Sequence, residues 1–275
     1  MTIIQALILG IVQGLAEMLP ISSSAHLNII PWILGWTKNP EFVLDFNASF
    51  DLALHFGTLI AIILFFYKDW ITLIKAGANK ILKKEDTFEG KLFWNIVIAT
   101  IFAGILAIIL DKISEKIIGG RQELEMGIIA TSLIVMGIVL YIVDKKAESK
   151  VTYKELNLKQ TILIGISQGL AAAFPGVSRS GITITVARAL KIDRESAAKI
   201  SFLLSTPIVA LAVLAEVNRF ALTSISFWVG IVASFIVGLI VIKILMEYLK
   251  KGSFKIFAIY RVILGLIIFG IIFIR

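Results

Sequence analysis

The sequence of 275 residues contains no cysteine, which excludes disulfide bonds, thiolate metal sites and cysteine nucleophiles. It has only two histidines, and neither the G-x-x-x-x-G-K-[ST] phosphate loop nor the H-E-x-x-H zinc helix occurs in it. Charged side chains make up only 17% of the residues. These absences exclude the P-loop nucleotide-binding and zinc-peptidase classes.

What the chain has instead is apolar side chains, which make up 58% of its residues and give a mean hydropathy of +0.94. A composition this apolar indicates a polytopic membrane protein. The formal net charge of +8 is then not a sign of nucleic-acid binding. We expect it to reflect lysine and arginine gathered at one membrane face.

An internal repeat organises the sequence. Residues 10–23 and 165–178 are identical at eight of fourteen positions with an offset of 155 and no gap, where chance gives about one or two. The copies differ where chemistry could occur, since Glu17 corresponds to Ala172 and Ser24 to Arg179. We predict that the two copies meet and build one site, with a carboxylate from one and a guanidinium from the other.

Short apolar pieces surround each copy of the repeat. Residues 1–18 and 25–36 are each shorter than the roughly 20 residues that cross about 30 Å of hydrocarbon, so we expect a re-entrant hairpin. Irregular backbone at that depth is tolerated only where it lines a protein cavity. A second hairpin is predicted at 158–190. Full spans are predicted at 48–67, 92–110, 123–143, 197–216, 222–242 and 255–274.

The predicted fold is an all-α polytopic membrane protein that forms a single membrane domain over 1–275. It comprises a first repeat over 1–143 and a second over 158–275, each a re-entrant helical hairpin plus three transmembrane helices. A hairpin returns to its own side whereas three spans do not, so the second repeat is expected to have inverted topology.

Basic residues agree with this topology. Four loops assigned to the inside hold six, five, four and four lysines or arginines, which is 19 of the 27 in the chain; they are 68–91, 144–159, 188–199 and 243–255. The outside loops hold five, namely Lys38, Lys112, Lys116, Arg121 and Arg219. Positive-inside asymmetry therefore places both termini outside, with the first hairpin entering from outside and the second from inside.

Two charged residues at membrane depth are candidates for function. Glu17 lies one helical turn after Gln13, and an unpaired carboxylate in hydrocarbon costs several kcal/mol, so a ligand role competes with a structural ion pair between hairpins. Arg179 lies between Ser178 and Ser180, where hydroxyls, a half-helix N-terminus and a planar cation make an anion site. The alternative is that these serines only cap helices.

Three further residues could carry chemistry or hold the fold. His26 lies just after the serine run. His55 lies one helical turn after Asp51, and we expect this pair to support the site indirectly or to lie at an interface. Arg261 is a third charge within a predicted span, and we expect a structural role in which its side chain reaches toward the inner surface.

These motifs resemble a known family. The [EQ]-x-x-x-E motif over 13–17, the segment Leu19-Pro-Ile-Ser-Ser-Ser-Ala-His26 and the segment Pro175-Gly-Val-Ser-Arg-Ser-Gly-Ile-Thr183 are similar to those of bacterial undecaprenyl-diphosphate phosphatases, which are integral membrane enzymes linked to bacitracin resistance. The resemblance extends over the whole chain. Gln13 stands where many members have a second glutamate, and Ser24-Ala25 replaces the commoner Thr-Gly.

The resemblance implies removal of the terminal phosphate of a polyprenyl diphosphate at the outer side of the bacterial cytoplasmic membrane. It implies Glu17 as the essential acid, Ser23 as the favoured nucleophile, Arg179 as a phosphate ligand and His26 as a further catalytic residue. A divalent cation, Mg²⁺ or Ca²⁺, is expected on Glu17 and Gln13. The expected phosphate contacts are Ser22, Ser24, Ser178, Arg179, Ser180 and Thr183.

Several alternatives stay open at this point. The nucleophile is Ser23 or a water that it positions, and the base is Glu17 or His26. The rival function is a lipid-phosphate transporter, because inverted repeats with broken helices are also transporter architecture. The expected partners are the polyprenyl diphosphate and membrane lipids but no nucleic acid, and a homodimer is one of the oligomeric states left open.

Overall fold

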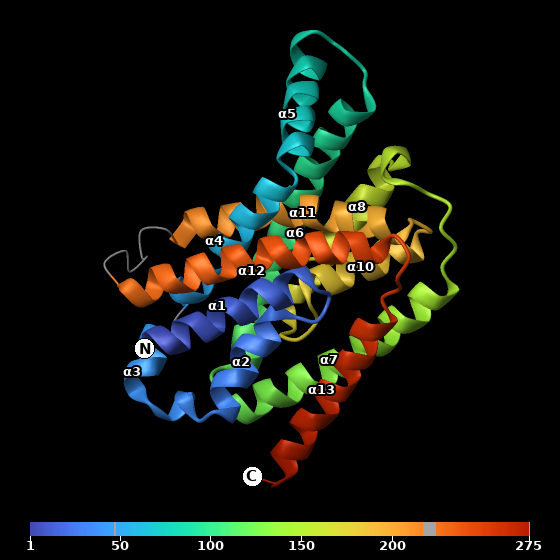
Figure 1. Ribbon diagram of the computed structural model, residues 1–275. Helices are drawn as coiled ribbons and strands as arrows, with labels where there is room; N and C mark the ends of the chain where they lie inside the picture. The colour runs from blue at the N-terminus through green and yellow to red at the C-terminus, as the bar shows by residue number, and fades with distance from the viewer. Residues whose placement is uncertain (47, 217–223, 275) are drawn as a thin grey trace.

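The computed structural model describes residues 1–46, 48–216 and 224–274, which are helical apart from short connections and an isolated β-bridge. Figure 1 shows their arrangement. In chain order the elements are α1 (Ile3–Met18), α2 (Ser23–Ile33), η1 (Trp36–Lys38), α3 (Pro40–Asp45), α4 (Ala48–Phe65), α5 (Tyr67–Leu82), α6 (Phe88–Ile118), α7 (Gln122–Lys146), η2 (Tyr153–Glu155), α8 (Leu158–Ser167), α9 (Leu170–Ala173), α10 (Arg179–Ala189), α11 (Arg194–Glu216), α12 (Ile225–Leu249) and α13 (Lys255–Ile274).

Five of the described helices are long and apolar enough to cross a membrane, namely α6, α7, α11, α12 and α13. A sixth candidate is the pair α4 and α5, which are bent by 77° at their junction. Helix α1 is apolar but has 16 residues, fewer than the roughly 20 that a full span requires. The prediction of an all-helical, multi-pass membrane protein is confirmed, with five to six candidate spans.

Helix boundaries depart most from prediction around α6, which was expected over 92–110 and is a helix of 31 residues. Residues 111–118, predicted as loop, continue it until Gly119 adopts the left-handed conformation at φ 49°. The predicted loop 68–91 likewise contains α5, which projects with the start of α6 away from the other helices (Figure 1). These connecting segments are thus largely helical, because charged side chains mark where a chain leaves an apolar layer but do not end a helix, and lysine and glutamate are good helix formers.

The other predicted spans lie within a few residues of observed helices. Helix α12 runs on to Leu249, past the predicted end at 242. The predicted loop 217–221, with Arg219, and the first two residues of the predicted span 222–242 lie outside the described residues.

Helices from the two halves of the sequence interleave. Helix α1 lies against α12, which in turn lies against α4, and α7 pairs with α13 (Figure 1). Helix α6 packs against α8 as well as against α5. Glycine permits the close crossing of α1 and α12, because a Cβ atom at Gly10 would lie 2.6 Å from the carbonyl oxygen of Gly230.

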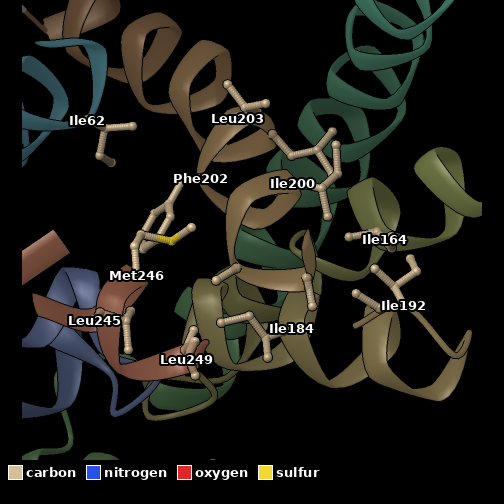
Figure 2. Packing of buried hydrophobic residues seen from close by; sticks show 14 of the residues in the cluster. Ile62, Ile164, Ile184, Ile192, Ile200, Phe202, Leu203, Leu245, Met246 and Leu249 are labelled. Carbon is tan, nitrogen blue, oxygen red and sulfur yellow. The ribbon is translucent and has the colours of Figure 1, made fainter. Parts of the chain in front are cut away.

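The largest buried apolar cluster of the described residues joins helices from both halves of the chain. Figure 2 shows Phe202 of α11 beside Met246 of α12, with Ile62 of α4 facing the same space. Ile184 of α10 and Ile164 of α8 belong to the same cluster. Burial of this apolar surface holds α10, and so the residues at its start, in a fixed position relative to α4, α8 and α12.

A buried ionic cluster anchors the other end of α10. The carboxylate of Asp144 accepts hydrogen bonds from Arg188 Nε at 2.8 Å and Arg194 Nε at 2.9 Å, and from the backbone N–H of Phe254 at 3.2 Å. Arg188 also donates to the carbonyl oxygen of Ala147 at 3.0 Å. These bonds tie the end of α7 to α10, to the start of α11 and to the residue before α13.

Candidate functional site

The carboxylate of Glu17, in the last turn of α1, is the point where two helix breaks meet. Its Oε1 accepts a hydrogen bond from Arg179 Nη2 at 2.9 Å, and its Oε2 accepts one from Ser23 Oγ at 2.6 Å. Ser23 is the first residue of α2 and Arg179 the first residue of α10. The two copies of the repeated segment therefore meet at one buried carboxylate.

A serine caps the helix that follows each break. The Oγ of Ser22 accepts from the backbone N–H of Ala25 at 3.4 Å, and the Oγ of Ser178 accepts from that of Gly181 at 3.0 Å. Both serines have positive φ, at 76° and 72°. Capping is the ordinary reason for serine at this position, so these two hydroxyls serve local structure while the residue after each reaches Glu17.

The caps shift the correspondence between the two copies by one residue. The first break has one residue between Pro20 and its cap, whereas the second has two between Pro175 and its cap. The extra residue is Gly176, with φ at 93°, and a Cβ atom there would lie 2.8 Å from the carbonyl oxygen of Ile129. In local structure Ser23 therefore corresponds to Arg179, and Ser24 does not.

The remaining hydroxyls predicted to bind phosphate occupy different surroundings. Ser24 lines the cavity described below and lies 3.2 Å from Ser22 Oγ. Ser180 Oγ is 3.3 Å from Ser178 Oγ and donates to the carbonyl oxygen of Leu19 at 3.4 Å. Thr183 lies between helices, where its Oγ1 is 2.7 Å from Ser201 Oγ, so the structure does not bring it to the cavity.

The ring nitrogens of His26 have partners other than Glu17. Its Nδ1 lies 2.7 Å from the carbonyl oxygen of Ser22, and its Nε2 lies 2.6 Å from the hydroxyl of Tyr260. The two rings stack with centroids 5.6 Å apart. Both ring nitrogens of His26 are therefore engaged at the contact between α2 and α13.

His55, expected to act only indirectly or at an interface, lies at the centre of the site. Its Nε2 is 3.5 Å from Glu17 Oε2, and its Nδ1 is 2.9 Å from the carbonyl oxygen of Asp51. The Asp51 carboxylate is 3.7 Å from the same nitrogen. The sequence indicated only that Asp51 and His55 lie four residues apart on one helix face. It contained no signal that α4 packs beside α1.

Arg261 is fully buried and joins the two breaks. It donates to the carbonyl oxygen of Pro20 at 3.2 Å from Nη1, and to those of Gly176 and Val177 at 2.9 Å from Nη2. The structural role expected from the sequence is thus observed. The expectation that its side chain reaches toward the membrane surface is wrong, because carbonyl groups freed by both helix breaks surround the guanidinium.

A cavity of about 380 Å³ opens beside Glu17. Its lining combines the polar residues of both breaks with apolar side chains of α11; it comprises Ser23, Ser24, Asp51, Leu52, His55, Ala107, Asp111, Gln168, Ala171, Ala172, Ser178, Arg179, Ile208, Val209 and Ala212. A second hollow of about 380 Å³ shares Ser24, Asp111, Ala171 and Ala172 and extends to Gly120. The site therefore has room for a charged group beside an apolar wall.

Gln13, predicted as a metal ligand, lies behind Glu17. Its Nε2 is 3.4 Å from Glu17 Oε2, while its Oε1 is buried without a hydrogen-bond partner. In the part of the chain that the structure describes, no group of three or more His, Cys, Asp or Glu could hold a metal ion. The two residues predicted as metal ligands therefore offer one carboxylate and one amide oxygen.

This arrangement supports nucleophilic chemistry on an anion. A hydroxyl and a carboxylate within hydrogen-bond reach of each other can act as nucleophile and base, as Ser23 and Glu17 are placed to do. Arg179 orients the same carboxylate by binding its other oxygen. The guanidinium of Arg179 is partly exposed to the cavity, with 27% of its side chain accessible. It can therefore pair with a bound phosphate.

Comparisons with known proteins agree over the whole chain. The family model described as bacitracin resistance protein BacA matches residues 6–267. The protein named undecaprenyl-diphosphatase in Pelotomaculum thermopropionicum is 43% identical over 268 residues, which cover 97% of this chain and 95% of that protein. Proteins of the same name in Caldicellulosiruptor bescii and Methanosphaera stadtmanae are 41% and 40% identical, covering 100% and 96% of this chain and 99% and 96% of their own. The chain therefore belongs to the bacitracin resistance protein BacA family.

Proposed function

We propose that this protein is an undecaprenyl-diphosphatase, which hydrolyses undecaprenyl diphosphate to undecaprenyl phosphate and inorganic phosphate. It thereby recycles the lipid carrier for cell-wall synthesis and gives bacitracin resistance. Full-length relatives that carry this name support the assignment. The observation that carries it is the Ser23 hydroxyl 2.6 Å from Glu17, with Arg179 on the other oxygen of that carboxylate.

Arg179 binds the diphosphate, with Ser24 and Ser178 in the same cavity, and stabilises charge that develops on the phosphoryl oxygens. The polyprenyl tail stays in lipid. In the serine route, Ser23 Oγ gives its proton to Glu17 and attacks the terminal phosphorus, the bond to the bridging oxygen breaks, and undecaprenyl phosphate leaves. Water then hydrolyses the phosphoserine. In the water route, Ser23 holds the attacking water and no covalent intermediate forms.

Glu17 is favoured over His26 as the base in either route. A base has to lie within hydrogen-bond reach of the proton it accepts. Glu17 meets this condition at 2.6 Å, whereas both nitrogens of His26 are already engaged by Ser22 and Tyr260. His55, 3.5 Å from Glu17, is placed to stabilise the charge on that carboxylate.

A divalent cation, Mg²⁺ or Ca²⁺, is part of the proposal. The unpaired Oε1 of Gln13 and the carboxylate of Glu17 are hard oxygen donors on one helix face, which suits a hard divalent cation. When bound, such a cation neutralises charge on the phosphates. The protein residues that would hold it are Glu17 and Gln13.

The proposed architecture is one membrane domain of two inverted repeats, 1–143 and 158–275, each with a re-entrant hairpin and three spans. Reciprocal packing supports this architecture. In the two repeats α8 corresponds to α1 and α12 corresponds to α6; α1 lies against α12, and α8 lies against α6. The basic residues of the sequence favour a site that opens to the outside of the bacterial cytoplasmic membrane.

Phosphate release from undecaprenyl diphosphate by purified protein, with and without Mg²⁺ or EDTA, tests the proposed function. Wild-type protein is expected to release phosphate only with the cation. Ser23→Ala is expected to lose at least about 100-fold in rate while still binding the lipid, since the pair with Glu17 is gone. Ser226→Ala, remote from the cavity, is the matched control.

Absence of hydrolysis from wild-type protein that binds the lipid contradicts the phosphatase proposal. It would favour a lipid-phosphate transporter, in which Ser23→Ala leaves transport largely intact because a carrier requires no nucleophile.

A further inference from the structure

Gln168 is a polar residue of the cavity that the proposed mechanism does not use. It lies between α8 and α9 and is only 3% exposed. Neither its Nε2 nor its Oε1 has a hydrogen-bond partner. Buried amide groups are nearly always hydrogen-bonded, and leaving one unpaired is costly. The residue lines the cavity together with Arg179 and Ser178.

The first copy of the repeat shows which kind of group can serve as hydrogen-bond partner for a glutamine at this position. Gln13 is the counterpart of Gln168 at an offset of 155, and its Nε2 lies 3.4 Å from the carboxylate of Glu17, four residues later. Four residues after Gln168 the chain has Ala172, which also lines the cavity. The second copy therefore has the donor but lacks the anion.

We infer that Gln168 is a binding residue for the diphosphate group, whose oxygen takes the place that the Glu17 carboxylate has in the first copy. The inference rests on the proposed function for the identity of the ligand. Nε2 of Gln168 donates to a phosphate oxygen, and Oε1 accepts from a water or a protonated phosphate oxygen. Arg179 supplies the positive charge that attracts the diphosphate group. Gln168, on the cavity wall between α8 and α9, fixes the position of that group by hydrogen bonding.

Gln168→Leu is the most direct variant, because it keeps a similar volume and removes both polar atoms. We expect kcat/KM for undecaprenyl diphosphate to fall about tenfold or more, mainly through KM, since a hydrogen bond to a charged group is lost. Thermal stability is expected to be unchanged or higher, because an unpaired buried amide has been removed. A purely structural glutamine would give the opposite result, a lower Tm with KM unchanged in the folded fraction.

Two further variants sharpen the test. Ala172→Glu supplies the missing carboxylate, and we expect it to pair with Gln168 and weaken binding of the diphosphate group. Ser167→Ala is the matched control. Ser167 lies at the centre of a G-x-S-x-G pentapeptide, 165–169, but its Oγ donates to the carbonyl oxygen of Ile164 at 2.6 Å, and it does not line the cavity.

Binding of inorganic diphosphate by calorimetry, measured beside hydrolysis of the lipid, separates the two proposals. Weaker binding in Gln168→Leu and Ala172→Glu, with Ser167→Ala like wild type, supports the subsite whether or not wild-type protein hydrolyses the lipid. Missing hydrolysis in wild type would reject the phosphatase alone. Wild-type affinity and wild-type KM in Gln168→Leu would overturn the inference.

Discussion

At the scale of residues, Glu17 is the centre of the proposed chemistry. Its carboxylate is contacted by Ser23, Arg179 and His55, which come from three different helices. In a setting of low dielectric such a carboxylate requires these partners, because an isolated buried charge is strongly disfavoured. The same contacts that stabilise the buried charge also orient it toward the serine hydroxyl, so stability and the proposed chemistry depend on one set of bonds.

Arg261 provides a prediction about the support of this site. Arg261→Met is expected to leave the carbonyl groups of Pro20, Gly176 and Val177 without a donor, at about 1–3 kcal/mol for each unsatisfied group. We therefore expect a large drop in Tm and loss of phosphate release. Arg261→Lys should recover little, because one ammonium group cannot replace a planar fork. Arg121→Met, on the exposed surface, should change neither measurement, and an equally stable Arg261→Met would contradict the account.

At the scale of elements, the two helix breaks are local structures that place Ser23 and Arg179 against Glu17. The second break requires Gly176, which has φ at 93°. Gly176→Ala is expected to lower Tm strongly, because the added Cβ atom would meet the carbonyl oxygen of Ile129 at 2.8 Å. Phosphate release should fall as well, since Arg179 lies three residues further on.

Gly127→Ala in α7 is the matched control for this prediction. A Cβ atom there has nothing within 4 Å, so the change should stabilise its helix by about 0.5–1 kcal/mol. Equal Tm shifts for the two variants would show that the conformation of Gly176 is not required.

At the scale of the whole molecule, orientation in the membrane is the prediction that follows from charge. The chain has no cysteine, so single cysteines can be introduced without a background. In intact spheroplasts, a membrane-impermeant maleimide is expected to label Lys116→Cys, from the predicted outside segment. Glu85→Cys, between α5 and α6, should be labelled only after lysis. The reverse pattern would place the termini inside and contradict the positive-inside assignment.

The sequence predicted much of this architecture because its signals are local. Proline and serine runs mark the breaks, apolar length marks the spans, and the repeat shows which segments are counterparts. Contacts between segments distant in the chain could not be read in this way. The place of His55 beside Glu17, the burial of Arg261 and the partner of His26 all depend on how α4 and α13 pack. The single extra residue at Gly176 could not be recognised from the sequence, because the identities Pro20/Pro175 and Ser23/Ser178 favoured an alignment of the two copies without a gap.

The central claim is that both halves of the chain build one phosphatase site through Glu17 and Arg179. A double-mutant cycle on phosphate release from undecaprenyl diphosphate tests it most directly, with Glu17→Ala, Arg179→Ala and the double variant measured at matched folded fraction. Residues that act as a unit lose activity non-additively. We predict that each single variant loses at least about 100-fold and that the double variant is within about tenfold of the worse single variant. Losses that multiply as for two independent sites, or activity retained in either single variant, would contradict the account.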